Sequence, residues 1–92
     1  MKYSLYFPTP LTKINPLDDN IDVCLQLEDG RTYTFVCATP ENLKSLMKKD
    51  NVQYIHPEMR FIIVASLQEH IIQQAIEAMI ANDHLLQLYG GD

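Results

Sequence analysis

Alternation of apolar and polar residues is the strongest structural signal in this chain, and it lies on both sides of the turn Glu28-Asp29-Gly30. Seven large or sulfur-containing apolar side chains occupy every second position there: Ile21, Val23, Leu25, Leu27, Tyr33, Phe35 and Cys37. This period of two predicts a β-hairpin. A two-residue Asp29-Gly30 turn would place Tyr33 and Phe35 on the face opposite the aliphatic residues. A three-residue loop closed by Gly30 in the left-handed conformation pairs Leu25 with Tyr33 and keeps all seven on one face, so we expect that register.

The same register separates the two cysteines. Cys37 pairs with Ile21 and faces the core, whereas Cys24 falls on the opposite face of the hairpin. We therefore expect two free thiols, with Cys37 acting as a small apolar residue.

Three further segments have the composition of strands. Tyr3, Leu5 and Phe7 alternate with polar neighbours, and Pro8 ends that strand. The apolar run within residues 60–65 predicts a central strand, after a possible short extended piece over 52–55, and residues 84–89 predict a last strand. Residues 8–20 contain three prolines and predict a surface connection from which three apolar side chains contact the core: Leu11, Ile14 and Leu17.

Two helices are predicted from their starting signals. Thr39 at the N-cap and Pro40 at the first helical position begin a helix that ends at Asp50-Asn51. Its expected buried stripe consists of Leu43, Leu46 and Met47. Ser66 and Glu69 have the spacing of a capping box, which predicts a second helix of about 16 residues that ends at Asn82-Asp83. Its apolar half consists of Ile71, Ile72, Ala75, Ile76, Met79 and Ile80.

The resulting order is β-ββ-α-β-α-β in a chain of 92 residues. That length is enough for a single domain with one modest core. Strands that flank each helix call for right-handed crossovers, which bring both helices to one face of the sheet. We predict an α/β (α+β) two-layer sandwich, with a mixed sheet of four or five strands and two helices on one face.

Charge is distributed unevenly along the chain. The formal net charge is −5, yet no Lys or Arg follows Arg60, while four acidic residues do. Because phosphate contacts depend on Lys and Arg, this third of the chain predicts no nucleic-acid partner and no anionic membrane surface. The absence of a long apolar run and the presence of only two cysteines favour a cytoplasmic protein.

One segment groups residues that could perform chemistry. Tyr54, His56, Glu58 and Arg60 occur at every second position, so an extended backbone would place them on one side. Arg60 could then orient a carboxylate or phosphate, with His56 as the proton carrier. The alternative is a loop at Pro57 whose polar side chains face water.

Other constellations are missing from the sequence. The three histidines lack metal-binding spacing, and no glycine-rich phosphate loop or nucleophile motif occurs, so we expect no metal and no cofactor. Catalysis is less expected than binding.

Three functional hypotheses remain open from the sequence. The first is a non-enzymatic protein-interaction module that acts as a homo-oligomer or with a protein partner, through exposed strand edges or the small residues Ala78 and Ala81. The second is an acidic inhibitor or immunity-type protein for a basic partner. The third is a small ligand-binding protein or enzyme that uses His56, Glu58 and Arg60. The sequence identifies neither the partner or ligand nor the oligomeric state.

Overall fold

The hairpin expected from the alternating residues forms the centre of the sheet. In the computed structural model, which describes residues 2–56 and 59–89, β2 spans Asn20–Leu27 and β3 spans Thr32–Ala38. They pair antiparallel with Leu25 opposite Tyr33 and Val23 opposite Phe35, so the predicted register is confirmed. Gly30 closes the loop with φ +93°, a conformation that a side chain would strain.

The two cysteines lie on opposite faces of this hairpin, as predicted. Cys37 is fully buried and pairs with Ile21, whereas Cys24 pairs with Thr34 and is half-buried. Both are free thiols.

The sheet has four strands in the order β1-β2-β3-β4. β1 (Tyr3–Tyr6) pairs antiparallel with β2, and β4 (Ile62–Ile63) pairs parallel with β3. The prediction of a central strand over residues 60–65 was wrong, because β4 is a two-residue edge strand. Arg60 has φ +46°, which turns the chain away from β3 just before β4 begins.

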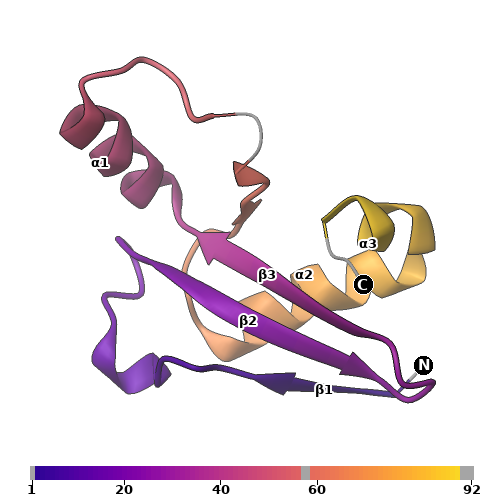
Figure 1. Cartoon of the computed structure of the whole chain (residues 1–92). Helices are drawn as coiled ribbons and strands as arrows, with labels where there is room; N and C mark the ends of the chain where they lie inside the picture. The colour runs from indigo at the N-terminus through magenta and orange to yellow at the C-terminus, as the bar shows by residue number, and fades with distance from the viewer. Residues whose placement is uncertain (1, 57–58, 90–92) are drawn as a thin grey trace.

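The second layer of the sandwich consists mainly of α2 (Glu69–Ala81), which lies across one face of the sheet (Figure 1). Ile72, Ile76 and Met79 are buried against the sheet, as the predicted apolar half requires. The predicted α+β class and two-layer arrangement are therefore confirmed. The capping box was wrong, because Gln68 is the N-cap and no side chain caps the helix. Leu67, which is 2 % exposed, instead donates its N–H to the Pro16 carbonyl at 2.7 Å and delays the start of the helix.

The expected last strand is a helix, α3 (Asp83–Tyr89). The backbone N–H of Leu86 bonds to the Asn82 carbonyl at 3.3 Å, and the Leu86 side chain is 1 % exposed. The helical turn buries Leu86 and leaves Leu85 and Leu88 partly exposed. The strand predicted for residues 84–89 was therefore wrong, and burial of Leu86 accompanies the helix that replaces it.

The first helix, α1 (Pro40–Asp50), begins and ends as predicted, with Thr39 as N-cap and Asn51 as a left-handed C-cap. Thr39 is fully buried, and its hydroxyl donates to the Leu17 carbonyl at 2.9 Å. Figure 1 shows α1 beyond the end of β3 rather than across the sheet, so of the two predicted helices only α2 covers the sheet face, and the expectation of both on one face was wrong. No residue of α1 is buried, so the stripe expected to be buried is only half-buried: Leu43, Leu46 and Met47.

The proline-rich connection, residues 8–19, contains one short 3-10 turn, η1 (Leu11–Lys13). Leu11 and Ile14 pack against the core, as expected. Leu17 is 61 % exposed, so its predicted core contact was wrong. Its carbonyl instead accepts the hydroxyl of Thr39, which joins this connection to the start of α1.

Candidate functional site

The chain after α1 folds back beside that helix instead of forming an extended piece. Asn51 has φ 56°, and the N–H of Val52 bonds to the Met47 carbonyl at 2.9 Å. These two features turn the chain at the end of the helix. Residues 52–55 therefore form bends and loop, and the possible short strand there was wrong.

This turn decides where the predicted site residues lie. Tyr54 and His56 are both exposed and line the same pocket. Arg60 is also exposed but does not line that pocket, and its Nη1 donates to the Leu88 carbonyl at 3.1 Å. Glu58 lies outside the described residues. The structure therefore brings two of the four predicted residues together and directs Arg60 toward α3.

The pocket between α1 and the segment that follows it has a volume of about 260 Å³. Five of its eight lining residues are apolar, with a carboxylate, a phenol and an imidazole beside them. The lining residues are Leu46, Asp50, Val52, Tyr54, Ile55, His56, Met59 and Phe61. We call this set the α1 surface. A mostly apolar hollow with a few polar groups suits either one apolar side chain or a very small ligand.

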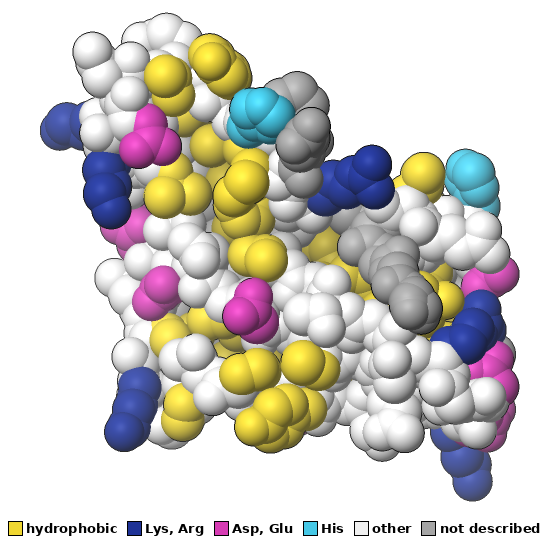
Figure 2. Space-filling view, in the orientation of Figure 1, with side chains coloured by type: hydrophobic (Ala, Val, Ile, Leu, Met, Phe, Trp, Pro, Cys, Tyr) yellow, Lys and Arg dark blue, Asp and Glu magenta, His cyan; other side chains and the backbone are white. Residues whose placement is uncertain are grey.

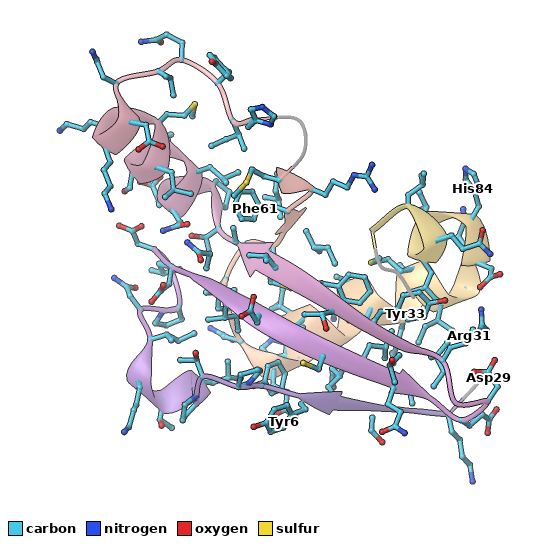
Figure 3. All side chains as sticks on the ribbon, in the orientation of Figure 1. Tyr6, Asp29, Arg31, Tyr33, Phe61 and His84 are labelled. Atoms are coloured by element: carbon cyan, nitrogen blue, oxygen red, sulfur yellow. The ribbon has the colours of Figure 1, made fainter. Side chains whose placement is uncertain are left out.

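Large apolar side chains of the α1 surface reach solvent. Tyr54 is 61 % exposed and Met59 is 52 % exposed, while nearby Ile63 of β4 is 58 % exposed. Figure 2 shows hydrophobic side chains gathered over α1 and the following segment. Phe61 lies at the base of this segment, next to β4 (Figure 3). Sequence reasoning missed Met59 and Phe61, although an apolar residue on each side of Arg60 was a visible signal.

The exposed lysines of α1 lie outside the lining of the α1 surface. Lys44, Lys48 and Lys49 are exposed on α1. Lys44 lies 3.5 Å from Glu41 in a solvent-exposed ion pair, which contributes little to stability. Lys44 and Lys48 line a separate hollow with Met47, whereas the lining of the α1 surface includes the carboxylate of Asp50.

A second polar cluster sits at the other end of the sheet, where Figure 3 shows Asp29, Arg31 and Tyr33 close to the hairpin turn, while His84 lies apart on α3. The Arg31 guanidinium contacts Asp29 at 2.8 Å and Asp83 at 3.2 Å. Hydrogen bonds that the guanidinium donates to Asp29 and then to Asp83 raise the pKa of Arg31. The hydrogen bond that the Arg31 backbone N–H donates to Asp29 is the largest cause that lowers the pKa of Asp29. This cluster joins the hairpin turn to the start of α3.

The Cys37 thiol is free and lies in the hydrophobic core. Burial raises the pKa of Cys37 to about 12, which keeps it protonated and unreactive near neutral pH. The prediction that Cys37 behaves as a core residue is confirmed by its complete burial.

Metal binding finds no support in the described part of the chain, where no group of three or more His, Cys, Asp or Glu side chains could hold an ion. Within residues 2–56 and 59–89, no helix is both long and apolar enough to cross a bilayer. Comparison of the sequence and structure with protein-family models, curated proteins and solved structures gives no match.

Proposed function

We propose that this protein is a protein-interaction module that binds another polypeptide through the α1 surface. The observation that carries the proposal is the exposure of Tyr54 and Met59 beside an open apolar pocket. Large apolar side chains gathered around a concavity are typical of protein-binding surfaces.

The size and chemistry of the pocket favour a polypeptide partner. A volume of about 260 Å³ is below the range of about 300–1,000 Å³ usual for small-molecule sites, but it accommodates one large apolar side chain. Two free cysteines fit a reducing compartment, so a cytoplasmic location belongs to the same proposal.

The other two hypotheses have less support. Three acidic residues occur in the described chain after Arg60, but Asp83 contacts Arg31 and Glu69 accepts a hydrogen bond from Gln73. These pairings weaken the case for an acidic inhibitor surface. The enzyme hypothesis requires Arg60 to join His56, whereas the Arg60 guanidinium bonds to the Leu88 carbonyl.

The test is site-specific crosslinking in the native host with a photoreactive phenylalanine derivative at Tyr54. The matched control places it at Tyr6, which is 65 % exposed on the uncovered face of the sheet. We expect one defined crosslinked species from position 54 and none from position 6. No species from position 54, or the same species from both positions, would refute the proposal.

Self-association is one form of this function and has its own measurement. Light scattering after size-exclusion chromatography at micromolar concentration gives the mass of the particle. A dimer that Tyr54→Ser dissociates and Tyr6→Ser leaves intact identifies the partner as a second copy. A monomer removes the homo-oligomer and directs the crosslinking test to a different protein.

A further inference from the structure

The outer edge of β3 is paired over only part of its length. β4 is aligned with Cys37 and Ala38, and the N–H of Val64 continues this pairing by bonding to the Ala38 carbonyl at 2.9 Å. Residues 32–36 extend beyond β4 on the same side of β3. Among the described residues, no strand pairs with residues 32–36 on this side of β3.

The register of the β2–β3 hairpin determines which main-chain groups face the outer edge of β3. The Leu27 N–H bonds to the Arg31 carbonyl at 2.9 Å, so alternate residues from Arg31 onward pair with β2. Thr32, Thr34 and Val36 therefore direct their main-chain groups away from β2. In the parallel register with β4, the Val36 carbonyl faces the N–H of Ile62 as its acceptor. The N–H groups of all three residues and the carbonyls of Thr32 and Thr34 have no partner among the described residues.

We infer that this edge accepts an extended segment of a partner protein as an additional strand beside β3. Donors and acceptors that repeat every two residues, about 6.8 Å apart, are matched by another extended backbone and by few other ligands. Thr32 and Thr34 are exposed and Val36 is half-buried, because their side chains lie on the face of the sheet opposite the core. The inference rests on the proposed function, because it names the kind of partner that such a module would bind.

The flanks of the edge define the side chains of the partner. Ile63 is 58 % exposed at the β4 end, and α3, which lies beyond the outer edge of β3 in Figure 1, carries the partly exposed Leu85 and Leu88. These residues favour apolar side chains at alternate positions of the added strand. Among the described residues, Arg60 donates to the neutral Leu88 carbonyl, and no carboxylate of that part of the chain lies within ion-pair distance of it. A carboxylate on the partner would be a stronger acceptor for this guanidinium.

The first measurement is amide hydrogen exchange by NMR on the free protein. The amides of Thr34 and Val36 should exchange at least about tenfold faster than those of Tyr33 and Phe35, whose N–H groups bond to β2. Equal protection would mean that the edge is already covered, and it would overturn the inference.

The second measurement adds a capped synthetic peptide of alternating valine and threonine that ends in aspartate, at millimolar concentration. We expect slower exchange at Thr34 and Val36 and no such effect from the same peptide methylated at every backbone nitrogen. The Arg60→Ala variant should weaken binding of this peptide but not of one that ends in asparagine.

Three results contradict strand addition: no change at Thr34 and Val36, the same change with the methylated peptide, or resonance shifts confined to α1. The Tyr54→Ser variant separates this inference from the proposed function. It should lose the crosslinked partner yet bind the peptide at β3 like the wild type.

Discussion

Ionisation of the buried Cys37 thiol should make the protein lose stability at alkaline pH. Burial raises its pKa from 9.0 to about 12 in the folded state, so the unfolded chain releases this proton first. The stability that this group contributes is therefore complete below pH 9 and falls as the pH rises toward 12. At pH 11 the unfolded thiol is ionised and the folded one is not, which amounts to about 3 kcal/mol.

The assay compares urea unfolding of the wild type and Cys37→Val between pH 8 and pH 11, with reductant, by circular dichroism. The wild type should lose about 3 kcal/mol more than the variant over this range. Tyr3, whose pKa burial and then Glu77 raise, is present in both proteins, so its effect cancels. Cys37→Ala separates packing from ionisation, because it lowers stability at every pH yet should follow the pH dependence of Cys37→Val. Parallel curves for wild type and Cys37→Val would refute the reasoning.

Three further predictions concern the buried Leu86 of α3, the N-cap Thr39 and the two cysteines. Leu86→Ala should lower the free energy of unfolding by about 2–5 kcal/mol because it opens a cavity under α3, whereas Leu85→Ala should cost less than about 1 kcal/mol; urea unfolding measures both. Thr39→Val removes a cap and a hydrogen bond to a carbonyl in one buried side chain, and the same assay should show a loss of about 1–3 kcal/mol; no loss would mean that neither bond contributes. Without reductant, a thiol reagent should react with two free thiols per denatured chain, and a disulfide would leave none. In the native protein the reagent should modify Cys24 but should reach the buried Cys37 only after unfolding.

Local sequence patterns predicted the structure correctly where all the apolar side chains of an element had to face the core. In β2 and β3, every large side chain had to face the same way, and only the three-residue loop allowed it. The same holds for the apolar half of α2 and for the ends of α1. These features required no knowledge of distant contacts.

Long-range contacts decided the features that the sequence did not predict. Leu67 bonds to Pro16 and is buried, which displaces the start of α2 from the capping box at Ser66. Arg31 bonds to Asp83 across 52 positions of sequence, at the start of the helix that replaces the expected strand. Neither of these two contacts could be predicted from the residues that adjoin Leu67 or Arg31 in the sequence.

The candidate site was predictable in part. Tyr54 and His56 lie on one pocket, but the turn at Asn51 rather than an extended backbone brings them there. An isolated sequence does not show that α1 stands off the end of the sheet with its apolar stripe half-buried. That placement leaves Leu46 available to line a pocket with residues from the following segment.

The left-handed conformation of Arg60 interrupts the extended backbone just before the apolar run, so β4 begins only at Ile62. A non-glycine residue at φ +46° carries a cost of about 1–2 kcal/mol, and a β-branched side chain raises that cost further. Arg60→Val should therefore favour an extended backbone at residues 59–61, which would lengthen β4 along the free edge of β3.

Arg60→Gly is the matched control, since it also removes the bond to the Leu88 carbonyl but accepts a positive φ without strain. Hydrogen exchange at Thr34 and Val36 should be slower in Arg60→Val than in Arg60→Gly, because the lengthened strand bonds to those residues. If both variants exchange at the same rate, the backbone conformation of Arg60 does not limit the length of β4. The contacts of Met59 and Phe61 in the pocket beside α1 must then keep residues 59–61 away from β3.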